Sequence, residues 1–522
     1  MASAPAPSAR PPALALEGID KRFGTVHANR AIDLVVPAGT IHGIIGENGA
    51  GKSTLMNIVY GFYQPDSGRL LVDGRVCAIR SPQDAIRAGI GMVHQHFMLV
   101  EPFTVLENLL LGAEGGPTLE AGIARARSEV AALERDYGLE VPLDARVADL
   151  PVGVQQRVEI LKALFRGART LILDEPTGVL TPQEADHLFR ILRSLRAQGR
   201  TILLITHKLR EIMAVTDQVS VMRQGSMVAH RRTAETSKEE LAELMVGRKV
   251  LLRVEKRPAR PREPILEVQR LEVADEQGVR RVKGVSFAVR AGEIVGIAGV
   301  SGNGQQELMA ALSGEDLRAP AGSIKLFGQD IAHDSPRRRR KEGLHFVPEE
   351  RLGRGAVPTL SLAANTLLTR TGTVNRSGWI RTAEVTALAE NLIKRFNVKA
   401  GGPDAAARSL SGGNLQKFIV GREIDAAPKL LIVSQPTWGV DVGAAAQIRG
   451  ELLALRDKGC ALLVVSEELD ELFEICDRLV VIAQGRVSPS IATAQATIEM
   501  IGEWMSGLWN RAGAKETDHA EA

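Results

Sequence analysis

The chain alternates short apolar runs with longer stretches in which apolar residues recur at helical spacing. The runs lie at 41–45, 171–173, 201–205 and 461–465, and each is bounded by polar residues. Parallel strands that are buried on both faces have this continuous apolar character, so the pattern predicts an α/β fold with mainly parallel sheets. No run approaches the ~18 apolar residues of a membrane span, so other chains would have to cross any membrane on which this one acts.

The pattern occurs twice in the same order. The segment 38–46 is similar to 291–299, at an offset of 253 residues, and both 171–177 and 204–207 match segments 260 residues further along. The chain has 522 residues, which is more than one hydrophobic core supports, because domains usually have ~100 to 200 residues. The sequence therefore predicts a duplicated domain.

The boundaries of these domains follow from composition. We expect a flexible tail at 1–13, a first domain at 14–247, a linker at 248–264, a second domain at 265–508 and a tail at 509–522. The linker segment carries five arginines and three prolines, with too little apolar material to pack. The start of the chain is rich in Ala, Pro and Ser and lacks an apolar core, so it is predicted to be a tail rather than a signal peptide.

Bulk charge excludes one class of partner. There are 65 basic and 62 acidic residues, for a net charge of +3, so the basic footprint of a nucleic-acid-binding protein is missing. One basic run, 337–341, could contact anionic lipid or RNA, but we expect a solvated face. Cys77, Cys460 and Cys476 lie far apart, which argues against a disulfide framework or a zinc site and fits a reducing cytoplasm.

A phosphate-binding motif, G-x-x-x-x-G-K-S, stands between the apolar run 41–45 and a helical run at 55–60. It consists of Gly46, Glu47, Asn48, Gly49, Ala50, Gly51, Lys52 and Ser53, and Thr54 follows it. The context predicts backbone N–H groups that bind the phosphates of ATP at a helix N-terminus. Lys52 would neutralise phosphate charge, and the Ser53 hydroxyl would bind Mg²⁺. A glycine-rich turn without a nucleotide is the alternative, and the Lys and Ser argue against it.

Two adjacent carboxylates, Asp174 and Glu175, follow the apolar run 171–173. The carboxyl ends of parallel strands lie beside the phosphate loop in this class of fold. Asp174 could hold Mg²⁺ through water, and Glu175 could accept a proton from an attacking water. The alternative is a pair of solvated acids at the start of a loop.

Together these elements resemble the ATP-binding-cassette (ABC) family over nearly the whole chain, from residue 14 to about 508. The resemblance implies an α/β fold of two tandem P-loop NTPase domains of ABC type, each with a mainly parallel sheet core and a helical subdomain. It also implies an ATP-hydrolysing enzyme whose cofactors are ATP and Mg²⁺.

The resemblance gives roles to three more residues of the first half. It implies that Phe23 stacks on adenine, although a core phenylalanine is the alternative. It implies that Gln95 touches the metal and couples its state to a membrane partner, and that His207 is a catalytic residue at the γ-phosphate. His94 and His96, which flank Gln95, are expected to be solvated or packed rather than metal ligands.

Both halves depart from the family's motifs in complementary ways. In the first half, Pro151 replaces a signature serine and Thr181 replaces an aspartate. In the second half the replacements are Gln305 and Gln306 in the phosphate loop, Glu349 at the glutamine-loop position, Ser434 and Gln435 for the Asp-Glu pair, and Glu467 for the histidine. The second half retains its signature and its aspartate, as Ser411, Gly412, Gly413 and Asp441.

Family members pair their domains head to tail, so each ATP would lie between one phosphate loop and the other domain's signature. In that arrangement the replaced residues of both halves lie in the same ATP site. The other site joins Lys52, Glu175 and His207 to the intact signature, with Asp441 in a coupling role. A single hydrolytic site is therefore expected. A second domain that decayed into a spacer is the alternative, but it predicts a damaged signature in that half.

Fused halves with this asymmetry resemble the ATPases of sugar and nucleoside importers. The segments 93–105 and 208–212 resemble most closely the branch for purine nucleosides. This implies integral membrane permease subunits as partners, indirectly a substrate-binding lipoprotein or periplasmic protein, no nucleic acid, and a peripheral position on the cytoplasmic face of the inner membrane. The alternatives are a ribose- or galactose-type sugar importer and, with less support, a soluble tandem ABC translation-factor ATPase or a DNA-repair ATPase.

Overall fold

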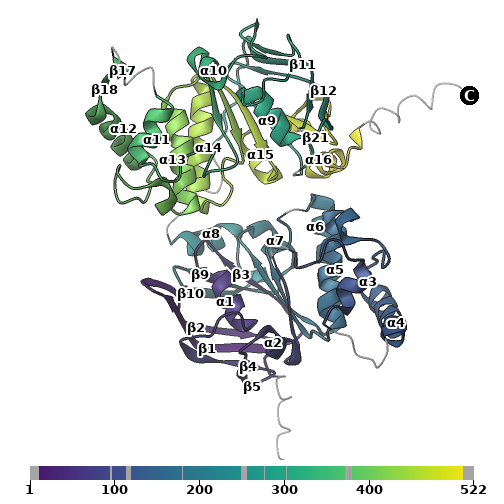
Figure 1. Ribbon diagram of the computed structural model, residues 1–522. Coiled ribbons are helices and arrows are strands. Elements are labelled where there is room, and N and C mark those ends of the chain that lie inside the picture. Colours follow the sequence, from purple (N-terminus) through teal and green to yellow (C-terminus); the bar gives the residue numbers. More distant parts are fainter. Residues whose placement is uncertain are drawn as a thin grey trace, which may run out of the picture. The chain divides into compact units, whose positions relative to one another are not determined.

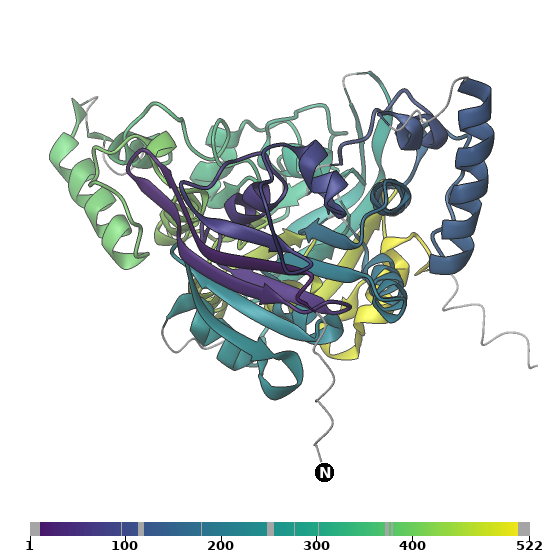
Figure 2. The same cartoon turned by 90° about the horizontal axis from the view of Figure 1, so that it is seen from below.

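The computed structural model (Figures 1 and 2) divides into two compact units, 1–250 and 251–522. It describes residues 11–94, 97–112, 119–178, 180–247, 255–275, 277–300, 302–370, 375–376 and 379–509. Each unit contains a mainly parallel sheet, an antiparallel sheet and a group of helices. The α/β class predicted from the apolar runs is confirmed.

The central sheet of the first unit has the strand order β10-β9-β3-β8-β7-β6. Its strands are β3 (Ile41–Gly46), β6 (Ile90–Val93), β7 (Thr170–Asp174), β8 (Thr201–Thr206), β9 (Gln218–Arg223) and β10 (Ser226–Arg232). All neighbours are parallel except β9 and β10. Every residue of β3, β7 and β8 is buried, which explains their continuous apolar sequence.

An antiparallel sheet of order β2-β1-β4-β5 completes the α/β part of this unit. Its strands are β1 (Leu14–Phe23), β2 (Val26–Val36), β4 (Ser67–Val72) and β5 (Arg75–Cys77). One hydrophobic core joins both sheets with α1 (Lys52–Val59) and α2 (Pro82–Arg87). Because α1 packs against both sheets, the loop that precedes it has a fixed direction.

Three helices at one end of the first unit form its helical subdomain (Figure 1). They are α3 (Val105–Leu110), α4 (Leu119–Tyr137) and α5 (Val152–Phe165), and Figure 2 shows α4 in blue at the edge of its unit. The remaining helices, α6 (Pro182–Ala197), α7 (Leu209–Val215) and α8 (Lys238–Val246), pack against the central sheet. Short 3₁₀ turns occur at η1 (Val147–Asp149) and η2 (Thr233–Glu235).

The second unit repeats the same strand order. Its central sheet runs β16-β19-β20-β13-β21-β22, with β23 paired to β21, and its antiparallel sheet runs β12-β11-β14-β15. The strands are β11 (Pro264–Ala274), β12 (Arg280–Arg290), β13 (Ile294–Ala298), β14 (Ile324–Leu326), β15 (Gln329–Asp330), β16 (Leu344–Val347), β19 (Leu430–Ser434), β20 (Ala461–Ser466), β21 (Arg478–Ala483), β22 (Arg486–Val487) and β23 (Ile491–Ala492). With β13 in the place of β3, and β19 and β20 in those of β7 and β8, the duplication predicted from the sequence is confirmed.

The helices of the second unit follow the same plan. They are α9 (Gln305–Ser313), α10 (Pro336–Glu342), α11 (Leu362–Leu368), α12 (Thr382–Arg395), α13 (Gly412–Asp425), α14 (Val442–Asp457), α15 (Leu469–Ile475) and α16 (Ile498–Met505), with a short hairpin of β17 (Asn375–Arg376) and β18 (Trp379–Ile380) and 3₁₀ turns at η3 (Ala407–Ser409) and η4 (Thr493–Gln495). Helices α11, α12 and α13 form the second helical subdomain. Across the described part of the chain, no helix is long and apolar enough to span a membrane.

The expected linker, 248–264, is described from residue 255 onward. Residues 255–263 have no helix or strand but pack on the second unit. Lys256 Nζ lies 3.6 Å from Asp477 Oδ1, and Arg456 Nη2 donates to the Arg257 carbonyl at 2.8 Å. Strand β11 then begins at Pro264. This segment therefore belongs structurally to the second unit.

The basic run 337–341 lies in α10 and is not the solvated face that we expected. The Arg339 side chain is 0% exposed, and burial lowers its pKa to about 10. Its guanidinium donates to the carbonyls of Ala311, Leu312, Ile331, Ala332 and Asp334. Arg340 donates to Glu423 at 2.5 Å. The expectation is wrong for these two residues because carbonyls from α9 and from the segment before α10 surround Arg339, and a carboxylate of α13 pairs with Arg340.

Candidate active site

The predicted phosphate loop of the first unit joins β3 to α1. Gly51, the residue before α1, has φ of +99°, and a Cβ there would lie 2.3 Å from the Ala28 carbonyl oxygen. Only glycine fits both the left-handed backbone and this close approach. The N–H groups of the loop therefore lie at the N-terminus of α1, where binding of an anion is favoured.

Lys52 begins α1 and is 6% exposed. Its Nζ donates to the carbonyls of Gly46 at 2.8 Å and Glu47 at 3.2 Å. Burial lowers the pKa of Lys52, and the nearby carboxylates of Glu175, Asp174 and Glu47 oppose that effect. The ammonium group thus lies inside the loop, where it can neutralise phosphate.

Ser53 and Asp174 meet at the carboxyl end of the sheet. Burial and the charge of Glu175 raise the pKa of Asp174, whereas a hydrogen bond with Ser53 and the charge of Lys52 oppose the rise. A hydroxyl and a carboxylate are oxygen donors of the kind that Mg²⁺ prefers, so these two residues fit the metal. The third expected ligand, Gln95, lies outside the described residues.

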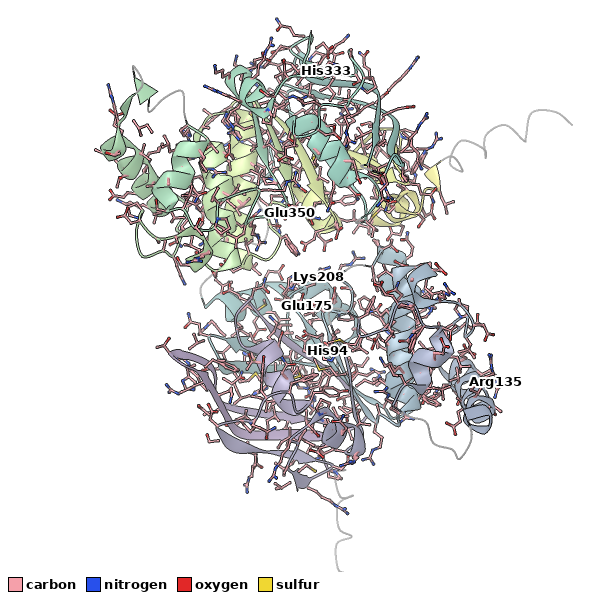
Figure 3. The ribbon with its side chains drawn as sticks, in the orientation of Figure 1. His94, Arg135, Glu175, Lys208, His333 and Glu350 are labelled. Carbon is pink, nitrogen blue, oxygen red and sulfur yellow. The ribbon has the colours of Figure 1, made fainter. Side chains whose placement is uncertain are left out.

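Glu175 follows β7 in a left-handed conformation, with φ of +47°. Its N–H donates to the Ile205 carbonyl at 2.8 Å, and its Oε1 lies 2.9 Å from His207 Nδ1. Burial raises the pKa of Glu175, but His207, Lys52 and Lys208 outweigh it and hold that pKa below the usual value. Figure 3 labels Glu175 and Lys208 at this edge of the sheet. An ionised carboxylate in this position can accept a proton.

Phe23, the expected adenine platform, ends β1 and is 43% exposed. The alternative of a core phenylalanine is therefore wrong. Tyr63 packs edge-on against Phe23 with ring centroids 5.2 Å apart, and Lys21 Nζ lies 5.5 Å from the Phe23 ring centroid. The sequence does not indicate that Tyr63 packs on Phe23, because its one signal is an aromatic residue shortly after α1.

His94 (Figure 3) packs against the rings of Tyr60 and Phe62, at centroid distances of 5.9 and 5.7 Å. It lines a cavity of about 260 Å³ with Glu159 and Lys162, and burial lowers its pKa. His94 is therefore packed, as expected. His96 lies outside the described residues.

The second unit copies the backbone of this site but not its chemistry. Gln305 Nε2 donates to the Val300 carbonyl at 2.7 Å, and its Oε1 accepts from the Asn303 N–H at 2.9 Å. A neutral amide thus replaces the Lys52 ammonium and engages one of the loop's own N–H groups. Gln435 repeats the left-handed turn, with φ of +49°. Burial and the neighbouring Glu350 raise the pKa of Glu349 at the glutamine-loop position.

The family model described as ABC transporter matches residues 30–178 and 282–438, which is more than half of the chain. The chain belongs to the ABC transporter family. Each of its two units contains one ABC domain, and as a member it binds and hydrolyses ATP for transport.

Three relatives match this ABC protein over nearly its whole length. The nucleoside import ATP-binding protein NupA of Lactococcus lactis is 45% identical, over 94% of this chain and 97% of its own. The glucose import ATP-binding protein TsgD13 of Haloferax volcanii is 44% identical, over 95% and 96%. The guanosine import ATP-binding protein NupO of Bacillus subtilis is also 44% identical, over 95% and 98%.

A solved structure of the archaeal ribosome recycling factor, in complex with a ribosomal stalk protein, matches with a TM-score of 0.62 and 20% identity. It covers 94% of this chain and 92% of that chain. The likeness is one of fold: two ABC domains in one chain.

The ABC signature of the second unit begins α13. Ser411 precedes the helix, and its Oγ accepts from Asn414 Nδ2 at 2.9 Å. The same position before α5 in the first unit is Pro151, which has no hydroxyl. The serine keeps its own proton available for donation to a phosphate.

The aspartate difference between the ABC units is smaller than the sequence indicated. Asp441 caps α14 by accepting from the Ala444 N–H at 2.7 Å, and Thr181 caps α6 in a capping box with Glu184. Both residues therefore cap the N-terminus of the helix that follows them. What the first unit lacks at this position is the charge, not the local structure.

Proposed function

We propose that this ABC protein hydrolyses ATP at one site and thereby powers the import of nucleosides. One observation carries the single-site part of the proposal. Glu175 and His207 are hydrogen-bonded beside the buried Lys52 in the first unit, whereas the second unit has Gln435 and Glu467 at the matching positions. Loss of a general base alone costs ~100- to 10,000-fold in rate, so hydrolysis in the second unit would be negligible.

The working site would be composite. The phosphate loop of the first unit would hold ATP, with Phe23 at the adenine and Mg²⁺ on Ser53, Asp174 and Gln95. The signature of the second unit, Ser411 to Gly413, would complete the site from the other side of the nucleotide. The proposal is supported by the chain's own asymmetry: the unit with the degenerate loop is the one that keeps the signature.

Nucleosides are favoured as the transported substrate by the likeness to the nucleoside and guanosine import proteins. The likeness to a glucose import protein, at 44% identity, favours a simple sugar as the second candidate. In either case the ABC protein would act at the cytoplasmic face of the cell membrane. It would bind integral permease subunits there, and a substrate-binding protein would deliver the cargo to them.

The test is ATP hydrolysis by the chain co-expressed with its membrane subunits in lipid, with and without nucleoside-loaded binding protein. The Glu175→Gln variant removes the proton acceptor and should lower stimulated turnover at least ~100-fold. The matched control is Gln435→Ala, which alters the corresponding position of the second unit and should leave turnover within about twofold of the parent.

Stimulation by nucleoside that disappears in Glu175→Gln and persists in Gln435→Ala supports the proposal. Residual turnover in Glu175→Gln that is lost on adding Gln435→Ala would mean that the second unit hydrolyses ATP. Stimulation by glucose or ribose but not by nucleosides would move the assignment to a sugar importer.

A further inference from the structure

The loop after β16 brings an arginine against the start of α13. Arg351 Nε donates to Gln416 Oε1 at 3.1 Å, and its Nη2 donates to the Trp438 carbonyl. Gln416 is itself buried and donates to the carbonyls of Gln435 at 3.2 Å and Pro436 at 3.1 Å. Arg351 therefore ties together the loop after β16, the first turns of α13 and the turn before α14.

Trp438 is the most exposed partner in this cluster. The guanidinium carbon of Arg351 lies 5.0 Å from the centroid of the indole ring, and the tryptophan is 55% exposed. A cation over an exposed aromatic face contributes ~0.5 to 1 kcal/mol. The arginine thus holds the exposed Trp438 of this turn, whereas Thr437 and Val440 of the same turn are buried.

Two glycines leave room for the guanidinium. A Cβ at Gly412 would lie 2.5 Å from Arg351 Nη1, and a Cβ at Gly439 would lie 2.9 Å from Nη2. Gly412 belongs to the signature, and Gly439 lies two residues before the helix cap Asp441. The guanidinium therefore occupies the space that side chains at these two positions would need, against the segment that is proposed to meet ATP.

The charge of Arg351 is not balanced within the described part of this unit. Burial lowers the pKa of Arg351, and none of the described acidic side chains opposes this effect. The N-terminus of α13 also carries partial positive charge, so a cation there is unfavourable by ~0.3 to 1 kcal/mol. An arriving phosphate would relieve this repulsion, which fits a position behind a nucleotide.

Among the described residues of the first unit, this arrangement does not occur. Four residues after the end of β6 stands Phe97, where the second unit has Arg351, and Gly178 stands where the second unit has Trp438. Neither offers a side-chain hydrogen-bond donor. The arginine contact thus accompanies the intact signature and is missing beside the degenerate one, where Pro151 replaces the serine.

We propose that Arg351 is a positioning residue for ATP hydrolysis, which holds Ser411, Gly412 and Gly413 in the geometry that receives the γ-phosphate. The proposal rests on the composite site proposed above. In the first unit the corresponding loop is expected to carry a metal-contacting glutamine. The proposal implies that in the second unit the loop after β16 instead supports the signature of the same unit.

The experiment measures kcat and KM for ATP in the complete transporter carrying Arg351→Ala, Arg351→Lys or Trp438→Ala. A misplaced signature should lower kcat ~10- to 100-fold in Arg351→Ala, with KM for ATP changed less than ~3-fold because ground-state binding rests on the first unit's loop. Lysine keeps the charge but not the planar fork, so Arg351→Lys should recover part of kcat. The exposed Trp438 can be removed without unfolding risk and should give a smaller loss of kcat.

The matched control is Arg395→Ala. Arg395 also lies over an aromatic ring, Phe396, at 4.9 Å, but it pairs with Asp425 at the C-terminal end of α13 and with Glu451 in α14 rather than with the signature. The kcat of Arg395→Ala should stay within about twofold of the parent, since exposed ion pairs contribute little to stability. A melting temperature measured for each variant separates folding defects from the kinetic effect.

A second variant, Ser411→Ala, separates this inference from the composite site. If Ser411→Ala lowers kcat and neither Arg351→Ala nor Trp438→Ala does, the positioning role is overturned and the composite site stands. If none of the three lowers kcat, the composite site fails and the inference with it. Equal losses in Arg351→Ala and Arg395→Ala, in proportion to their melting temperatures, would reduce Arg351 to a stabilising residue.

Discussion

Glu175 must be ionised to accept a proton, and its surroundings favour that state. His207, Lys52 and Lys208 together lower its pKa against the effect of burial, while burial and Glu175 itself raise the pKa of the adjacent Asp174. Two neighbouring carboxylates are thus driven apart in pKa, which is how one site assigns different tasks to the same functional group.

Removing His207 should therefore change the pH dependence of hydrolysis as well as its rate. In His207→Ala the pKa of Glu175 should rise, because its hydrogen bond and the nearby imidazole are lost. The acidic limb of kcat/KM against pH should then move to higher pH, and kcat should fall roughly 100-fold. His187→Ala, in α6, is the control and should leave the acidic limb in place. An unmoved limb in His207→Ala would contradict the role given to this pair.

At the scale of elements, the structures that the sequence predicts are those whose residues are contiguous. Strands β3, β7 and β8 are buried on both faces, so each is a local apolar run. The phosphate loop is equally local, because its glycines, lysine and serine lie within eight residues. These features could be read without any knowledge of the tertiary structure.

Features made by distant segments could not be predicted. Arg339 stands in a run of charges, and nothing in that run indicates that the end of α9 and the segment before α10 together supply five carbonyls to it. The pairing of Phe23 with Tyr63 is likewise formed across the fold. The amino-acid sequence gives the type of each residue but not whether its side chain is buried.

Helix α10 gives a direct test of the buried arginine. Arg339→Ala removes the guanidinium that donates to five carbonyls and should lower the free energy of unfolding by ~3 to 5 kcal/mol. Arg337→Ala, in the same helix but exposed, should change it by no more than ~0.5 kcal/mol. All four tryptophans lie in the second unit, so tryptophan fluorescence during urea unfolding reports on this unit alone. Equal effects of the two substitutions would contradict the structural role of Arg339.

At the scale of the whole molecule, two units share one backbone plan and differ in chemistry, so a ligand should stabilise them unequally. The first loop offers the Lys52 ammonium to phosphate, whereas the second offers the amide of Gln305, which is already bonded within its own loop. We therefore expect the two loops to differ in nucleotide affinity although their folds are similar.

Hydrogen exchange with and without Mg²⁺ and ATP should separate the two loops. A ligand at 100 times its Kd stabilises the state that binds it by ~2.7 kcal/mol, so exchange should slow in residues 46–59 and change less in 299–313. Lys52→Ala should abolish the protection, and Gln305→Ala should leave it unaltered. Equal protection of both loops in the parent chain would show that the second unit binds nucleotide as well as the first.

The left-handed turn occurs at Gln435 as well as at Glu175, with φ of +49° and +47°. Such a backbone costs of order 1 to 3 kcal/mol in a non-glycine residue, and the second unit has no carboxylate there to make use of it. Buried Thr437 and Glu471, hydrogen-bonded at 2.7 Å, still hold the turn. A glutamate substituted at position 435 would therefore find the backbone conformation of Glu175 already in place.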